Sequence, residues 1–305
     1  MIIRKTLLAL LVSAAAANVM AASSEAYVDQ TGTNQQATVT QEGGNQFAIS
    51  RQDGQGNLTN TEQQGSDNRS GIYQVGNANQ ATVTQKSVDS DSTVEQAGVA
   101  NQAQILQVAH NNTSFVFQLG EQNNAQVVHG GGGSHYSEVS QNGISNDAKL
   151  SQGGNANTSY ITQNGNENKA RVGQYGDTNR SNVLQSGNDN VAVVSQKDTG
   201  VVSGVQYGYA NEFRVTQGDL ATAEILQTGE QNYAEVDQTG YDNFASVDQN
   251  GRLHKADVTQ SGTDGEVWVA QTGVANTAIA TQSATGDYAS IIQAGTNNLA
   301  TVTQR

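Results

Sequence analysis

The sequence has 305 residues, a formal net charge of −14 and neither proline nor cysteine. The negative charge argues against nucleic acid and anionic membranes as partners, and the lack of cysteine excludes disulfides and thiolate metal or redox sites. Hydrophobic residues make up 35% and aromatic residues 5%, which supplies a conventional globular core poorly but is enough for a thin core of small side chains.

Residues 1–21 are predicted to be a secretory signal peptide. Arg4 and Lys5 provide the positive start, and residues 6–17 form a short apolar run. This run is too short for a membrane-spanning helix. We therefore expect cleavage between Ala21 and Ala22 and no insertion into the membrane.

A repeat of eleven residues organises the chain from residue 22 to residue 305. In the copy at 74–85, Gln-Val-Gly-Asn-Ala-Asn-Gln-Ala-Thr-Val-Thr-Gln, the stretch from Asn79 to Gln85 alternates as a strand does. Ala81 and Val83 then share the inward face with those two amides. Gly and Asn between successive strands tolerate the positive φ of a tight corner.

One such unit cannot bury its apolar face alone, so repeated units are expected to stack. Two units make a coil of about 22 residues with two facing strands. The predicted fold is an all-β, parallel two-sheet β-solenoid of the cross-β type. About thirteen coils, at ~4.8 Å each, would give a rod of roughly 60 Å.

Inward Gln and Asn side chains recur at fixed places in the repeat. A buried amide without partners costs ~1–3 kcal/mol, but amides stacked in register bond the identical group above and below. The positions predicted to form these ladders are Gln30, Asn34, Gln41, Gln74, Asn79, Gln85, Gln163, Asn168, Gln174, Gln238, Asn243, Gln249, Gln293, Asn298 and Gln304.

Four units depart from the repeat. Residues 86–95 lack the corner Gly and Asn, residues 129–140 insert one residue around four glycines, and residues 197–205 and 218–226 are each one residue short. Looser corners or small bulges are expected there, inside one continuous domain.

No motif points to catalysis. His129 and His135 flank the glycines and could hold a transition metal, but two ligands are too few for a closed site, so a mobile solvent loop is the prediction. Asp89 and Asp91 lack the pattern of calcium-binding repeats and are interpreted as a solvated acidic corner. With no paired nucleophile and base, we expect no catalytic residue, no cofactor, no metal and no enzymatic activity.

The unit Gln-x-Gly-x-x-Asn-x-Ala-x-x-x-Gln resembles the curlin repeat of bacterial curli amyloid subunits. The resemblance covers nearly all of the chain after residue 22, and residues 237–249 follow it throughout. It implies a subunit secreted through the periplasm and an outer-membrane export pore. On the cell surface such a subunit polymerises, with a curli nucleator as partner, into fibres that serve adhesion to surfaces and the biofilm matrix. The resemblance also implies that the inward Gln and Asn side chains of the end repeats drive this polymerisation.

Two alternatives remain open within this interpretation. The last four residues, Val-Thr-Gln-Arg, are similar to the end of the minor, nucleating subunit, which makes a nucleator the first alternative. A monomeric secreted β-solenoid adhesin is the second. Because the repeat runs from near Tyr27 to Gln304, we expect no capping element and two open strand edges, which favours head-to-tail stacking into a fibre.

Overall fold

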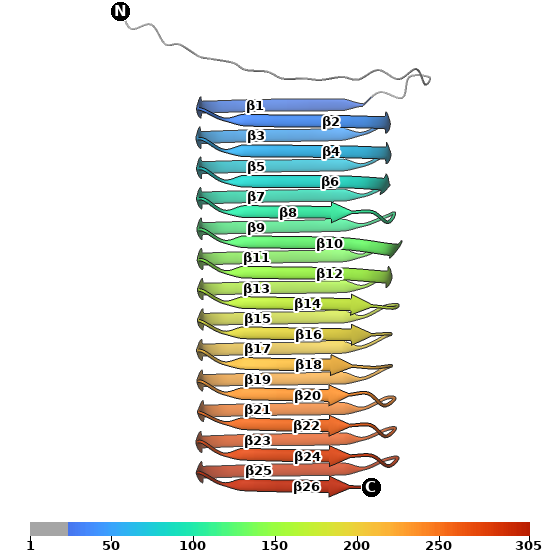
Figure 1. Ribbon diagram of the computed structural model, residues 1–305, viewed down its shortest axis with the longest axis vertical. Coiled ribbons are helices and arrows are strands. Elements are labelled where there is room, and N and C mark those ends of the chain that lie inside the picture. The colour runs from blue at the N-terminus through green and yellow to red at the C-terminus, as the bar shows by residue number, and fades with distance from the viewer. Residues whose placement is uncertain (1–23) are drawn as a thin grey trace, which may run out of the picture.

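The computed structural model describes residues 24–305, which form 26 strands and no helix (Figure 1). The predicted signal peptide and its cleavage site lie outside these residues. No helix in the described part is long and apolar enough to cross a membrane. The strands run back and forth between two edges and are stacked along the long axis.

The strands form two sheets of 13 strands each. The odd sheet contains β1 (Glu25–Thr33), β3 (Phe47–Gln55), β5 (Arg69–Asn77), β7 (Asp91–Val99), β9 (Thr113–Glu121), β11 (Tyr136–Ile144), β13 (Thr158–Asn166), β15 (Arg180–Asn188), β17 (Val201–Tyr209), β19 (Thr222–Glu230), β21 (Phe244–Arg252), β23 (Glu266–Val274) and β25 (Tyr288–Thr296). The even sheet contains β2 (Gln36–Gly44), β4 (Leu58–Ser66), β6 (Gln80–Val88), β8 (Gln102–Gln107), β10 (Asn124–Gly133), β12 (Asp147–Asn155), β14 (Lys169–Tyr175), β16 (Val191–Lys197), β18 (Glu212–Gln217), β20 (Tyr233–Gln238), β22 (Lys255–Gln260), β24 (Thr277–Gln282) and β26 (Leu299–Gln304).

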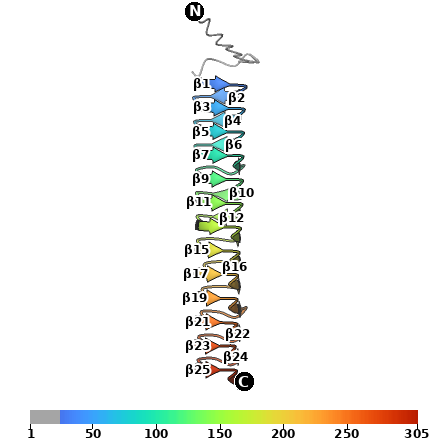
Figure 2. The same cartoon turned by 90° about the vertical axis from the view of Figure 1, so that its left-hand side faces the viewer.

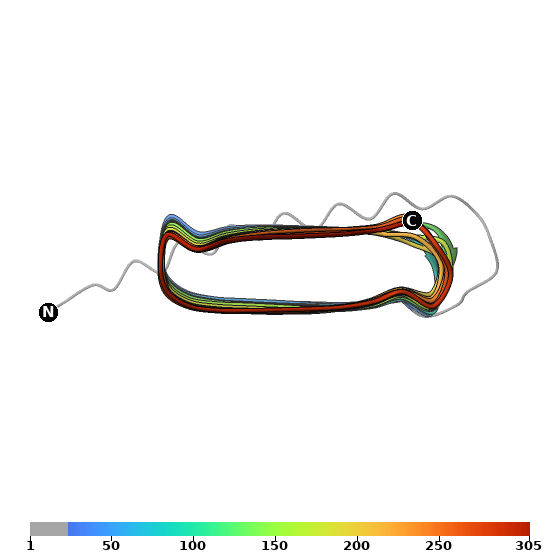
Figure 3. The same ribbon diagram turned by 90° about the horizontal axis from the view of Figure 1, so that it is seen from below.

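Each strand pairs in parallel with the strand two further along the chain, so every coil adds one strand to each sheet. Gln74 lies opposite Gln96, for example, and Gly76 opposite Gly98. Seen from the side the two sheets are thin layers (Figure 2), and seen along the axis the coils superpose as a flattened ring (Figure 3). The predicted parallel two-sheet β-solenoid of thirteen coils is confirmed.

The core lies between the sheets and is built from small side chains. Ala81 and Val83 of β6 are buried, as are Ile72 of β5 and Val94 of β7, while the residues between them face outward and are more exposed. A slip of one residue would exchange the two faces of a strand. Every strand is therefore held in one register.

One coil fills the core differently from its neighbours. Gly204 of β17 replaces the Val or Ile of the adjacent coils, and Phe213 of β18 replaces their Ala. The Phe213 ring occupies the space left by the glycine, since a Cβ added to Gly204 would lie 2.1 Å from its Cζ. The two exceptions thus compensate each other across the core.

The core also contains hydroxyl groups, of which some are hydrogen-bonded and others have no hydrogen-bond partner in the described residues. Ser181 Oγ of β15 is buried with no hydrogen-bond partner in residues 24–305, whereas Ser50 Oγ of β3 lies 2.6 Å from Thr59 Oγ1 of β4. We expect Ser181→Ala to raise the free energy of unfolding by about 1 kcal/mol, because it removes an unpaired polar atom. We expect Ser50→Ala to lower it by about 1–2 kcal/mol, because Thr59 would lose its partner.

Denaturant unfolding followed by circular dichroism measures both changes. The two substitutions are chemically identical, so each serves as the control for the other. Equal effects of the same sign would contradict the assignment of bonded and unbonded hydroxyls.

The two edges of the solenoid are unequal. Corners that follow odd strands form a regular edge, and corners that follow even strands form an irregular edge. Figure 3 shows the coils superposed closely at the first and spread apart at the second, on the right. All four departures from the repeat, at 86–95, 129–140, 197–205 and 218–226, fall at the irregular edge.

The departures are absorbed in different ways. The inserted residue at 129–140 produces a register shift between His129 and Gly132 in the pairing of β10 with β12. At the two short units the strand pairing stays continuous. Gly200 takes the corner position that Asn179 holds one coil earlier, and Ala221 takes it one coil later. The unit is therefore shortened in the corner and not in the strand.

Candidate assembly site in the amide ladders and end strands

An unbroken ladder of glutamines runs through the odd sheet. Each side chain donates from Nε2 to Oε1 of the glutamine in the next coil, at 2.6–2.9 Å. From Gln52 onward, Nε2 also donates to a backbone carbonyl of the even sheet, as Gln74 does to Leu58 O at 3.1 Å. The ladder members are Gln30, Gln52, Gln74, Gln96, Gln118, Gln141, Gln163, Gln185, Gln206, Gln227, Gln249, Gln271 and Gln293.

The ladder of the even sheet is interrupted once. It runs from Gln41 to Gln107 and resumes at Gln152, with links of 2.7–3.0 Å. His129 occupies the intervening position, and Gln107 donates instead to Ser114 Oγ at 3.0 Å. The predicted positions in this ladder are Gln41, Gln85, Gln174, Gln238 and Gln304.

An asparagine ladder follows the regular edge and has the opposite polarity. Asn79 Nδ2 donates to Oδ1 of Asn57 in the preceding coil at 3.2 Å, and the links that follow are alike. Asn168 and Asn298 belong to it as well. Glutamines thus donate to the following coil and asparagines to the preceding one. Each coil is therefore complementary to the next in only one orientation.

Two predicted asparagines lie elsewhere. Asn34 is exposed with a φ of 55°, and the ladder position belongs to Gln35, whose Nε2 contacts Thr31 O. The prediction for Asn34 is wrong by one residue, since the corner position is the fifth after Gln30. Asn243 lies at the irregular edge, where Gly265 N donates to its Oδ1 at 2.9 Å and no asparagine is stacked after it.

The prediction of a mobile solvent loop between His129 and His135 is wrong. His129 and His135 are buried, and their rings lie 5.5 Å apart. His129 takes a glutamine position and His135 an asparagine position of the stacked rows. The inserted residue is therefore accommodated in the glycine run between them. Burial first, and the neighbouring His135 second, lower the pKa of His129 to about 3.

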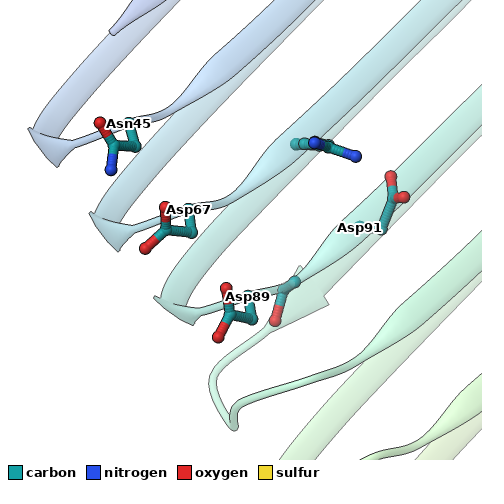
Figure 4. A pocket seen from close by; sticks show the side chains of 6 residues that line it. Asn45, Asp67, Asp89 and Asp91 are labelled. Atoms are coloured by element: carbon teal, nitrogen blue, oxygen red, sulfur yellow. The ribbon is translucent and has the colours of Figure 1, made fainter. Parts of the chain in front are cut away.

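The acidic corner lines a shallow pocket at the irregular edge (Figure 4). Asn45, Asp67 and Asp89 follow one another on successive corners, with Asp91 beside them. Burial raises the pKa of Asp91 and the charge of Arg69 opposes this. No group of three or more residues suited to a metal ion occurs in the described part of the chain.

The end coils leave the ladders open. Among residues 24–305, β1 and β2 pair only with β3 and β4, and β25 and β26 only with β23 and β24. Gln293 Nε2 donates to Thr277 O and Gln304 Nε2 to Tyr288 O, and the second amide proton of each finds no acceptor among residues 24–305. At the other end Gln30 donates to Gln52, and its Oε1 receives no bond from this part of the chain.

The comparisons with known proteins give one family. The sequence profile of the curlin associated repeat matches residues 54–86, 143–176, 165–197, 218–251, 240–273 and 274–305, together more than half of the chain. Each matched segment contains three successive ladder glutamines, as 54–86 contains Gln63, Gln74 and Gln85. A comparison with curated proteins finds no match.

Proposed function

Because this chain belongs to the curlin family, we propose that it is a structural subunit of extracellular curli-type amyloid fibres, growing by head-to-tail stacking of coils. In this proposal the protein is secreted through the periplasm and an outer-membrane pore, a curli nucleator starts growth, and the fibre serves adhesion and the biofilm matrix. The observation that carries the proposal is the match between the two end coils.

The end coils are complementary in register. Continuing the spacing of 22 residues that joins β23 to β25 would place Gln30 of a second copy opposite Gln293. Ala289, Ile291 and Gln293 would then meet Ala26, Val28 and Gln30, and on the other sheet Ala300, Val302 and Gln304 would meet Ala37, Val39 and Gln41. Inward residues of the same kind meet at all six places.

The polarity of the ladders supports head-to-tail joints. Gln293 Nε2 would donate to Gln30 Oε1 of the second copy. Asn298 Oδ1 would accept from the backbone N–H of Gln35 of that copy, just as Asn276 Oδ1 accepts from Asn298 N within the chain at 3.0 Å. In the glutamine ladders, a head-to-head joint would oppose two acceptors and a tail-to-tail joint two donors. Such a heterologous contact does not close, so it extends into a fibre.

Replacing Gln30 and Gln41 together by leucine is expected to raise the critical concentration for fibre growth by roughly tenfold or more. The amide protons of Gln293 and Gln304 would be buried at the joint without acceptors, at about 1–3 kcal/mol each. Sedimentation after seeded growth measures the concentration, and fibre diffraction near ~4.7 and ~10 Å identifies cross-β structure.

The matched control is Gln36→Leu, since Gln36 is an outward, exposed glutamine of the same end coil. Equal critical concentrations for the double variant and this control would contradict stacking through the end ladders. A wild-type chain that stays a soluble, folded monomer at high concentration would contradict the fibre proposal and support the secreted adhesin.

A further inference from the structure

Two histidines occupy asparagine positions in the corners, one at each edge. His254 lies between Asn232 and Asn276 at the regular edge, and His135 lies between Asn112 and Asn157 at the irregular edge. The backbone N–H of each histidine donates to Oδ1 of the asparagine in the preceding coil, at 3.0–3.1 Å. The bond to the following coil is made by the imidazole ring of each histidine.

The imidazole ring reproduces two of the bonds that a carboxamide makes at this position. Asn79 receives the backbone N–H of Asn101 on Oδ1 at 3.1 Å and donates from Nδ2 to the carbonyl four residues earlier at 3.3 Å. His254 receives the backbone N–H of Asn276 on Nδ1 at 3.3 Å, and its Nε2 lies 3.2 Å from the carbonyl of Asn250, also four residues earlier. Each polar atom of the amide thus has a counterpart on the ring.

His135 repeats this arrangement at the other edge. Its Nδ1 receives the backbone N–H of Asn157 at 3.3 Å, and its Nε2 lies 3.3 Å from the carbonyl of Gly131. Both rings therefore carry their proton on Nε2 and present a bare Nδ1 to the next coil. An imidazolium has two donors and no acceptor, so in that form Nδ1–H would face a backbone N–H.

We propose that His135 and His254 are asparagine surrogates that function only while neutral, so that acid loosens the solenoid at these two coils and leaves the asparagine-stacked coils closed. The inference concerns stacking inside one chain. It therefore stands whether or not copies of the chain assemble into fibres.

The surroundings of both rings favour the neutral form. Burial lowers the pKa of His135 and of His254, and the bonds to backbone carbonyls oppose this only in part. His129 is packed against His135, and His110 lies on the adjacent corner, where its carbonyl accepts from Ser134 N. Around His254 the charged residues are Glu230, Arg252 and Lys255, all exposed, and none of them bonds the ring within residues 24–305.

The direction of the pH effect follows from these shifts. The unfolded chain takes up a proton on each histidine near pH 6.5, whereas the folded chain does so only at a lower pH. Between those values the unfolded or locally opened state binds more protons, so stability falls as the pH falls below about 6.5.

Hydrogen exchange on the full-length protein tests the proposal at single amides. Between about pH 7.5 and about pH 5, after correction for the intrinsic rate, we expect protection of the Asn157 and Asn276 amides to drop roughly tenfold. The Asn101 amide, which bonds an asparagine in the same kind of position, is the internal control and keeps its protection.

Two variants separate the sites. His254→Asn is expected to abolish the drop at Asn276 and leave that at Asn157, and His135→Asn the reverse; both restore the repeat and so keep the fold. The proposal is overturned if Asn157 and Asn276 respond to pH as Asn101 does, if the drops persist in the variants, or if nitrogen chemical shifts at neutral pH place the ring protons on Nδ1.

Discussion

Phe213→Ala is expected to lower the free energy of unfolding by about 3–5 kcal/mol, because it empties the space opposite Gly204 and leaves a cavity. Gly204→Val alone is expected to lower it by about 1–3 kcal/mol or more, because the new side chain overlaps the ring, whose Cζ lies 2.1 Å from an added Cβ. Denaturant unfolding of the soluble chain measures both effects.

The double variant Gly204→Val/Phe213→Ala gives this coil the residues of its neighbours, Val183 with Ala192 and Ile225 with Ala234. We therefore expect its stability to return to within about 1 kcal/mol of the wild type, since volume-conserving exchanges in a core cost little. Additive losses in the double variant would contradict the compensation across the core.

Gly120→Ala is expected to lower the free energy of unfolding by at least about 3 kcal/mol. Gly120 has a φ of +117° at the regular edge, and an added Cβ would lie 2.1 Å from the carbonyl oxygen of Gly143 in the next coil. The backbone strain and the collision with rigid backbone add together. Thermal unfolding followed by circular dichroism at about 218 nm, the usual strand band, measures the loss.

The matched control is Gly131→Ala in the glycine run of β10, where an added Cβ meets nothing within 4 Å. Its effect is expected to stay within about 0.5 kcal/mol, as for ordinary surface substitutions. A loss at Gly131 comparable to that at Gly120 would mean that glycine is needed for chain flexibility and that the close stacking of corners is not the cause.

The unequal edges suggest how a long repeat tolerates variation. A strand in the stack is paired on both sides along its length, so an inserted or deleted residue there would shift every side chain to the other face. A corner can absorb such a change locally, as the shortened corners at Gly200 and Ala221 do. Because the irregular edge holds all four departures, the regular edge keeps its asparagine ladder unbroken except at His254.

The amino-acid sequence by itself determined the strand period, the inward face of each strand, the coil of two units and the glutamine positions of both ladders. These are properties of a period-two pattern with a fixed spacing, and they are legible because each coil must match the next. Counting five residues from Gln30 also leads to Gln35, and not Asn34, as the corner residue. His129 stands where the spacing of eleven requires a glutamine, which marks it as a ladder position.

Only the tertiary structure decided which residues meet after the coil has closed. Gly204 and Phe213 lie on strands of different sheets, and their compensation exists only because the two sheets face each other across a thin core. The two histidines at asparagine positions act through the hydrogen-bond direction of each ring nitrogen. The spacing of a repeat specifies where a side chain lies, whereas the neighbours in the coils above and below decide which atoms it must supply.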